Sequence, residues 1–349
     1  MQVYEWLAFS LFMNMINRTF RLLCLLPLLI FSCKHGETEK AISTKANTPA
    51  ALQELNQKIN AEPKNASYYN ERAKYYYTQK DLGAASKDIL DAITLDSSKA
   101  EFYVTLSDIF FAGGKSAQSK RSLDKSLLLD PANKEALLRM AELYLYVKDN
   151  KKSIEYLDKV LKIDVNTPKA YFIKGMDFKE MGDTTKAISS FQTTIEQDVE
   201  YYNAYVQLGL IYAARRNPLA LKYYENALKL DPKSIEVMYN TAMFLQENNQ
   251  LNKAIELYTK ILSIDPQNKY ANYNLGYIHY EYLKVFGEAV KHFSNAITCD
   301  PKYAEAVYMR GLCYEAMGDV QRASADYTQA LVIAPGYEKP MLGLKRLAE

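Results

Sequence analysis

The feature that most constrains this chain is a repeat with a period of 34 residues. Prolines mark one point of the repeat, spaced by 34 residues or close multiples of it, at Pro63, Pro131, Pro232, Pro266, Pro301 and Pro335. Ser97, Val165 and Val199 occupy the same point where proline is missing. A fixed period of this length is typical of short supersecondary units stacked in a row, because each unit buries its apolar face on the next. The chain therefore divides into eight units, at 64–97, 98–131, 132–165, 166–199, 200–232, 233–266, 267–301 and 302–335.

Each unit carries small residues at two positions, counted from Ala66 in the first unit and from its equivalent in the others. The eighth position holds Ala73, Ser107, Ala141, Gly175, Gly209, Ala242, Gly276 and Gly311. The twentieth holds Ala85, Ser119, Ser153, Ala187, Ala220, Ala254, Ala289 and Ala323. Large residues, many of them aromatic, follow each small position, as at Tyr76 and Ile89 in the first unit. This alternation predicts two closely packed helices per unit, with large side chains filling the volume between neighbouring units.

The succession of small, aromatic, small, aromatic and proline residues resembles the tetratricopeptide repeat (TPR) signature over residues 64–335. The tryptophan usual near the start of such a repeat is replaced here, for example by Tyr69 and Tyr103. The resemblance implies an all-α, right-handed superhelical solenoid of about eight helix–turn–helix units. We expect capping helices at 49–63 and 336–349 to cover the terminal apolar faces, which have no further unit to pack on.

Residues 1–33 differ from the repeats in composition. Arg18 and Arg21 precede an apolar run that ends at Phe31, a pattern typical of an export signal. The run is too short to span about 30 Å of hydrocarbon as a helix. Its end, Ile-Phe-Ser-Cys, resembles a bacterial lipobox, which implies lipidation of Cys33. The polar residues 34–48 then predict a flexible tether between the lipid and the repeats.

Alternatives remain for this segment and for the location that it implies. Residues 1–12 either extend the apolar run into an N-terminal signal anchor or lie upstream of a true start at Met13 or Met15. Lipidation of Cys33 predicts a bacterial cell-envelope protein, an outer-membrane lipoprotein that faces the periplasm or the cell surface. A cytosolic protein is the third alternative.

The resemblance to TPR arrays implies a binding site on the side lined by the first helix of each unit, where such arrays hold a peptide. From the fourth unit on, the fifth and ninth positions on this side are apolar or aromatic, and the sixth is asparagine in two adjacent units. An exposed apolar stripe marks an interaction site, and an amide group can both donate to and accept from a peptide backbone. The predicted partner-binding residues are Phe172, Met176, Tyr239, Asn240, Met243, Tyr273, Asn274, Tyr277 and Tyr308.

Two of these assignments have a purely structural alternative. Tyr239, Tyr273 and Tyr308 either contact a partner or pack on adjoining units of a tightly wound array. Asn240 and Asn274 either clamp a partner or are solvated polar residues on a helix surface.

Other classes of site find no support in the sequence. The chain has 43 basic and 41 acidic residues and a net charge of +2, whereas nucleic-acid binders concentrate Lys and Arg. No nucleophile elbow, P-loop, dinucleotide-binding or zinc-protease motif occurs, and the three histidines have no metal-ligand spacing. Cys299 and Cys313 are either free thiols or a disulfide. We predict no catalytic residues, metal, cofactor or small-molecule substrate.

The leading hypothesis is therefore an envelope-anchored adaptor, not an enzyme, that binds a partner protein or peptide in its concave groove. The alternative is a permanent structural subunit of an envelope complex, held through its convex face and edges.

Overall fold

The computed structural model describes residues 49–349, so the predicted signal segment, the tether and Cys33 lie outside the described residues. These residues form 18 helices and contain no strand. The series begins with α2 (Ala50–Ala61) and ends with α19 (Glu338–Ala348), and the helices between them form eight pairs. The first helices of the pairs are α3 (Ala66–Thr78), α5 (Ala100–Ala112), α7 (Lys134–Tyr146), α9 (Pro168–Glu180), α11 (Tyr202–Ala214), α13 (Ile235–Glu247), α15 (Lys269–Glu281) and α17 (Ala304–Ala316). The second helices are α4 (Leu82–Leu95), α6 (Ser116–Leu129), α8 (Asn150–Ile163), α10 (Thr184–Gln197), α12 (Leu219–Leu230), α14 (Leu251–Ile264), α16 (Phe286–Cys299) and α18 (Val320–Ile333).

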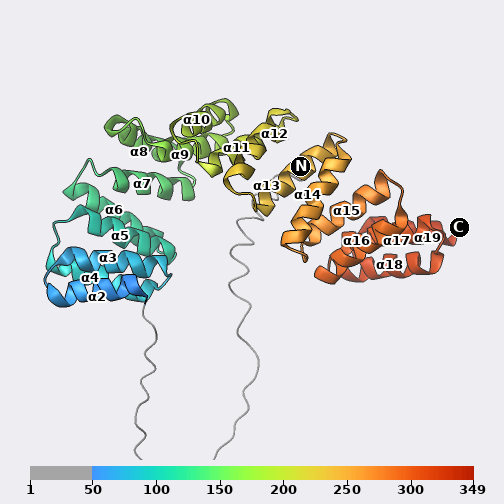
Figure 1. The fold of residues 1–349 in the computed structure, drawn as a ribbon, viewed down its shortest axis with the longest axis horizontal. Coiled ribbons are helices and arrows are strands. Elements are labelled where there is room, and N and C mark those ends of the chain that lie inside the picture. Colours follow the sequence, from blue (N-terminus) through green and yellow to red (C-terminus); the bar gives the residue numbers. More distant parts are fainter. Residues whose placement is uncertain (1–48) are drawn as a thin grey trace, which may run out of the picture. The chain divides into compact units, whose positions relative to one another are not determined.

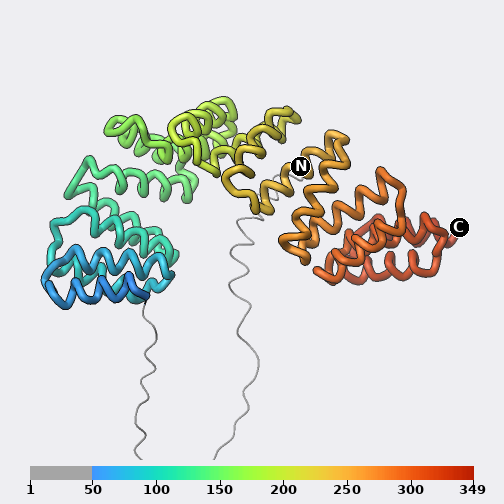
Figure 2. Tube along the Cα trace, in the orientation of Figure 1, coloured from blue at the N-terminus to red at the C-terminus, as the bar shows by residue number. Residues whose placement is uncertain are grey.

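This architecture confirms the prediction of an all-α array of eight helix pairs with one further helix at each end. Helices that follow one another in sequence also follow one another in space, as the colour order in Figures 1 and 2 shows. First helices of successive pairs contact each other, for example α3 with α5 and α7 with α9, whereas no comparable contact joins the second helices within 50–349. Successive pairs therefore lie closest together on the side of the first helices. None of the helices from α2 to α19 has both the length and the apolar character that a bilayer span requires.

Aspartates form the turns between pairs. The second helices of the first seven pairs all end at an aspartate, whose carboxylate accepts from the backbone N–H two residues later. In the first pair, Asp96 accepts from the N–H of Ser98 at 2.9 Å. Such an Asx turn redirects the chain, and a proline directly after the aspartate fixes the next φ angle and cannot continue the helix. The Asp-Pro dipeptides of the sequence therefore encode the boundary between units.

The turns within pairs depend on left-handed backbone. In the turn that follows each first helix, a single residue has a positive φ angle. These residues are Lys80, Gly114, Lys148, Gly182, Arg216, Asn249, Lys284 and Gly318. In the first pair, the N–H of Asp81 donates to the carbonyl of Tyr76 at 2.9 Å and so closes the helix end. Glycine adopts this backbone without steric strain, but five of the eight turns use another residue.

The closest packing within a pair joins the eighth position of the first helix to a large side chain of the second helix. A Cβ atom placed on Gly175 would lie 2.5 Å from the ring of Phe191. The equivalent distances are 2.4 Å from Gly209 to Tyr224, 2.9 Å from Gly276 to Phe293 and 2.8 Å from Gly311 to Tyr327. In the first and third pairs, an aliphatic Ile89 or Leu157 faces Ala73 or Ala141 instead. Glycine thus accompanies an aromatic ring in four pairs and alanine an aliphatic side chain in two, as expected for close packing, whereas the sixth pair combines Ala242 with Tyr258.

The first and the eighth pairs each contain a largely buried ion pair of the same kind. Arg72 of α3 donates to both carboxylate oxygens of Asp88 in α4, at 2.6 and 2.8 Å, and to the Asn56 side chain in α2 at 2.7 Å. Arg310 of α17 contacts Asp326 of α18 in the same bidentate way and also reaches Ser294 of α16. Each arginine thus links three consecutive helices at one end of the array. Bidentate arginine–carboxylate contacts are among the strongest hydrogen-bonded ion pairs.

A single carboxyl group is buried without a cation at the junction of the third and fourth pairs. Asp177 of α9 has no exposed surface, and one of its carboxylate oxygens accepts from the hydroxyl of Ser153 in α8 at 2.7 Å. The other oxygen has no hydrogen-bond partner. Burial raises the pKa of Asp177 to about 7, because desolvation penalises the charged form, while the Ser153 hydrogen bond acts in the opposite direction.

The matched volumes of Gly175 and Phe191 give a first prediction. Gly175→Ala should destabilise the protein by about 1–3 kcal/mol, because the added methyl group overpacks the contact. The double variant Gly175→Ala, Phe191→Leu reproduces the combination present in the third pair and should recover part of that loss. Urea unfolding followed by circular dichroism measures both. Phe191→Leu alone completes the comparison. If the stability losses of Gly175→Ala and Phe191→Leu simply add in the double variant, the two positions are not coupled.

A second prediction concerns pH. The pKa of Asp177 is higher in the folded state, about 7, than in an unfolded chain, about 3.9, so folding is favoured when the carboxyl is protonated. That stabilisation is fully present below the unfolded pKa and is lost as the pH rises through the folded value. Asp177→Asn should therefore change stability little near pH 4 and increase it by roughly 2 kcal/mol or more near pH 8, measured by urea unfolding at both pH values.

Asp183→Asn is the control for this pH dependence. The pKa of Asp183 is lowered by its hydrogen bonds with Lys186, so removing its charge should reduce stability near pH 8. A stability difference between Asp177→Asn and the wild type that is the same at both pH values would contradict the assignment.

Candidate functional site on the first helices

The first-helix face is defined here as positions 2, 6, 9 and 13 of the eight first helices, counted from the first residue of each helix. These positions are separated by four, three and four residues, so they lie on one side of an α-helix. Position 5 lies beside them. The nine residues predicted to bind a partner occupy positions 5, 6 and 9 of α9, α13, α15 and α17.

The aromatic residues at position 5 pack between neighbouring pairs. Phe172, Tyr239, Tyr273 and Tyr308 are all half-buried. Each ring contacts an aromatic ring of its own second helix, at centroid distances of 5.5 Å to Phe191, 5.9 Å to Tyr258, 5.5 Å to Phe293 and 5.6 Å to Tyr327, respectively. Each also contacts a tyrosine of the following unit, at 5.0 Å to Tyr201, 6.3 Å to Tyr270, 5.2 Å to Tyr303 and 5.3 Å to Tyr337. These contacts support the alternative in which the rings pack on adjoining units.

None of these four partner tyrosines was assigned from the sequence. Tyr201, Tyr303 and Tyr337 are the N-cap residues of α11, α17 and α19, where they make no side-chain capping hydrogen bond. In the first, third and seventh units the N-cap is asparagine, as at Asn133, whose side chain accepts from a backbone N–H of its helix. The tyrosines therefore exchange a capping hydrogen bond for an aromatic contact between units. The available signal was a tyrosine three residues after the aspartate or alanine that ends the preceding second helix.

Burial of these rings raises the pKa of their phenol groups. Desolvation raises the pKa of Tyr201 and of Tyr337 to about 12, and raises that of Tyr303 further. All three phenols are neutral at physiological pH and act as packing groups.

Position 9 carries the apolar part of the first-helix face. Met176, Met243 and Tyr277 are half-buried there, and so are Leu210 and Leu312 in the fifth and eighth pairs. The five residues belong to consecutive pairs, so they form a stripe along the array. Methionine adapts its shape to a partner, and tyrosine supplies contact area at a low entropic cost.

The two asparagines at position 6 have different surroundings. Asn274 is buried, and its amide nitrogen donates to the hydroxyl of Tyr239 at 2.9 Å and contacts the sulfur of Met243 at 3.7 Å. It therefore links the sixth and seventh pairs. Asn240 is half-buried in the sixth pair. Burial raises the pKa of Tyr239 to about 12, whereas the hydrogen bond from Asn274 lowers it.

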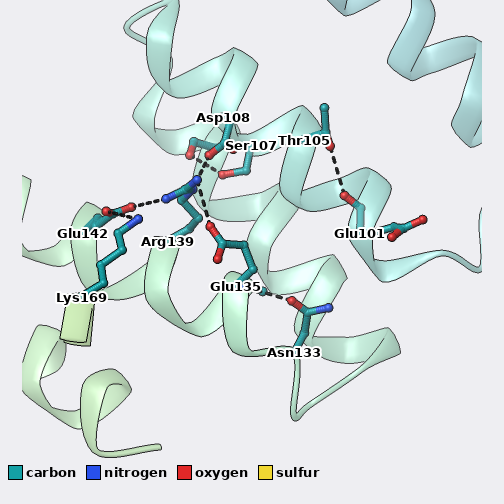
Figure 3. Close-up of polar contacts among 11 residues, drawn as sticks. Glu101, Thr105, Ser107, Asp108, Asn133, Glu135, Arg139, Glu142 and Lys169 are labelled. Atoms are coloured by element: carbon teal, nitrogen blue, oxygen red, sulfur yellow. Dashed lines mark hydrogen bonds and ion pairs between the residues drawn. The ribbon is translucent and has the colours of Figure 1, made fainter. Parts of the chain in front are cut away.

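A network of ion pairs joins the first helices of the second to fourth pairs, as Figure 3 shows. Arg139 of α7 forms ion pairs with Asp108 of α5 at 2.7 Å and with Glu135 and Glu142 of its own helix at 2.9 Å each. Lys169 of α9 contacts Glu142 at 2.8 Å. The network joins three successive pairs. Burial raises the pKa of Asp108 despite the opposing effect of Arg139.

The histidines and cysteines of residues 49–349 form no metal-binding group. Within 49–349, no cluster of three or more His, Cys, Asp or Glu side chains could hold a metal ion. His279 and His292 stack at 5.2 Å between α15 and α16, and the ring of His279 contacts the Leu275 carbonyl. Cys299 and Cys313 are both free thiols, which decides against the disulfide alternative.

Comparisons with known proteins agree with this architecture. Family models described as tetratricopeptide repeat match residues 134–166, 174–235, 212–273 and 304–337. The human IFIT1 dimer superposes with a TM-score of 0.53 at 16% identity, over 81% of this chain and 67% of that one. At this identity the likeness shows the fold alone.

Curated relatives match over parts of their length. A DnaJ homolog subfamily C member 7 homolog from Dictyostelium discoideum is 27% identical over 149 residues, covering 38% of this chain and 27% of that protein. The uncharacterized protein ycf37 of Pyropia yezoensis is 38% identical over 69 residues, covering 20% and 39%. A probable UDP-N-acetylglucosamine–peptide N-acetylglucosaminyltransferase SPINDLY from Solanum lycopersicum is 32% identical over 87 residues, covering 25% and 9%. The chain thus spans less than half the length of these relatives. The helix pairs and these matches together show that the chain contains tetratricopeptide repeats, arranged as an all-α solenoid.

Proposed function

We propose that this chain is an adaptor that binds a partner protein or peptide on the first-helix face of its fourth to eighth pairs. TPR proteins generally mediate protein–protein interactions. The observation that carries the proposal is the stripe at position 9, Met176, Leu210, Met243, Tyr277 and Leu312, which stays partly exposed on five consecutive pairs. An apolar stripe of this kind on a protein surface marks an interaction site.

The array suits such a role physically. Its helix pairs hold the stripe on rigid elements before a partner arrives, so little conformational entropy remains to be lost on binding. Because the rings at position 5 already pack between pairs, position 9 supplies most of the apolar contact with a partner in this proposal. At position 6, Ile173, Asn274 and Met309 are buried, whereas Gln207 and Asn240 are half-buried. In this proposal the chain acts by binding; the glycosyltransferase relative matches it over 9% of that relative's length.

The cellular location is a separate part of the proposal. We infer from the lipobox-like sequence that Cys33 is lipidated and that the adaptor is anchored in a bacterial cell envelope. The N-terminal signal anchor is the alternative.

A second candidate function, a permanent structural subunit, rests on the opposite surface. Leu90, Leu128 and Val332 lie on second helices, and their side chains are 52%, 74% and 77% exposed. Exposed aliphatic residues on this side favour a partner held by the second helices. The two candidates therefore predict sensitivity to substitutions on opposite faces.

The third prediction separates these faces. The variant Met243→Ser, Tyr277→Ser should lose capture of a partner by roughly tenfold or more, because two central apolar contacts are removed, while its helical content stays unchanged. The matched control Leu128→Ser, Val332→Ser should capture as the wild type does. Quantitative mass spectrometry of proteins retained from envelope extract gives the comparison. If only the control loses its partner, the structural-subunit function replaces the adaptor.

The fourth prediction addresses the anchor. Metabolic labelling of full-length chain with a fatty-acid analogue should label the wild type and leave Cys33→Ser unlabelled. Release of the Cys33→Ser protein from the membrane fraction should accompany the loss of label. Label that persists in Cys33→Ser would exclude lipidation at this residue.

A further inference from the structure

Charge is distributed unevenly between the faces of the array. Residues 49–349 contain 38 basic and 38 acidic residues, since five of the 43 basic and three of the 41 acidic residues precede them. The first-helix face nevertheless carries ten acidic residues, Glu71, Glu101, Asp108, Glu135, Glu142, Glu180, Glu236, Glu247, Glu281 and Glu305. Its basic residues are Lys74, Arg139 and Lys169. The face therefore has a net charge of −7, and the other described residues balance it with +7.

Most of these acidic side chains form no ion pair within the described residues. Arg139 and Lys169 pair with Asp108, Glu135 and Glu142. The other seven form no ion pair with any residue in 49–349, and all of them are exposed: Glu71, Glu101, Glu180, Glu236, Glu247, Glu281 and Glu305. The excess negative charge is thus available to a ligand.

Helix stability explains only some of these positions. Glutamates at position 2, such as Glu236 and Glu305, lie in the first turn of a helix, where the helix dipole favours negative charge. Glu180, Glu247 and Glu281 are instead the last residues of α9, α13 and α15, where the dipole disfavours negative charge. These three therefore oppose the stability of their own helices, and their placement calls for a role outside the fold.

The same three glutamates accompany the apolar stripe. Met176 and Glu180, Met243 and Glu247, and Tyr277 and Glu281 are separated by four residues, so each apolar side chain lies one helical turn from a carboxylate. The combination recurs in the fourth, sixth and seventh pairs. A face on which apolar groups alternate with unpaired carboxylates is complementary to a segment in which apolar residues alternate with Lys or Arg.

We propose, on the basis of the adaptor function above, that the first-helix face selects a cationic partner segment with apolar side chains. The apolar groups of the segment contact position 9, and its Lys or Arg side chains contact the glutamates at positions 2 and 13. Anionic segments are repelled by the net charge of −7 on the same face. Steering by this field accelerates encounter and weakens with added salt.

The test compares defined peptide probes on the purified full-length chain. One probe, about 15 residues long, alternates Leu and Phe with Lys; the second has Glu in place of every Lys, and the third has Ser in place of every Leu and Phe. Fluorescence anisotropy measures binding at about 50 mM and about 300 mM NaCl. The lysine–apolar probe should bind most tightly and lose affinity at the higher salt concentration.

Two charge variants locate the contact. In the first, Glu236, Glu247, Glu281 and Glu305 are each replaced by Gln; in the control, Glu155, Glu196, Glu225 and Glu256, all exposed on second helices, are replaced by Gln. Both variants change the net charge by the same amount. The first should bind the lysine–apolar probe about tenfold more weakly, and the control within about twofold of the wild type.

The outcomes separate this inference from the adaptor function. Equal losses in both charge variants, or no binding of the lysine–apolar probe, would overturn the inference. Binding of the glutamate probe that is abolished by Met243→Ser, Tyr277→Ser would also overturn it, while leaving the apolar face as a binding site. The adaptor function fails separately, if neither natural partners nor any probe responds to the substitutions at Met243 and Tyr277.

Discussion

The contact between a small residue of the first helix and a large side chain of the second helix is the constraint on which the whole array depends. Helices of 12 to 14 residues are marginal in isolation, so their stability comes from packing. The glycine at position 175 lets the Phe191 ring reach the first helix backbone, and this ring then supports Phe172 beside the next pair. The spacing within one pair thereby sets the surface on which its neighbour packs.

That succession of contacts explains what the sequence could predict. The eight helix pairs and their order followed from a 34-residue period, because small residues, large residues and turns recur in every unit. The left-handed turns at Lys80 and Lys148 could not be predicted, since these residues carry no glycine signal. The placement of Asn274 depends on Tyr239 in the preceding pair, a contact between units that a period within units does not reveal.

The candidate site was predicted only in part for a related reason. Residues of the first helices follow the helical period, so positions 5, 6 and 9 could be assigned from register. Tyr201, Tyr303 and Tyr337 lie at helix boundaries, outside that period, and their role appears only when neighbouring pairs are placed together. Their rings pack against the position 5 residues, which leaves positions 9 and 13 as the surface open to a partner. One face thus serves both for cohesion between units and for recognition.

The bidentate arginine contacts at the two ends have a consequence for how the array comes apart. In a stack of repeats the terminal units have a neighbour on one side only, so fraying from the ends is the ordinary route of unfolding. Arg72 joins α2, α3 and α4, and Arg310 joins α16, α17 and α18, so each terminal pair is tied to the helix before it. Such ties raise the free energy of local opening where the stack is otherwise weakest. Slow hydrogen exchange would then extend into the outermost pairs, and the loosest amides would belong to an interior pair such as the fifth, whose second helix is the shortest of the eight second helices.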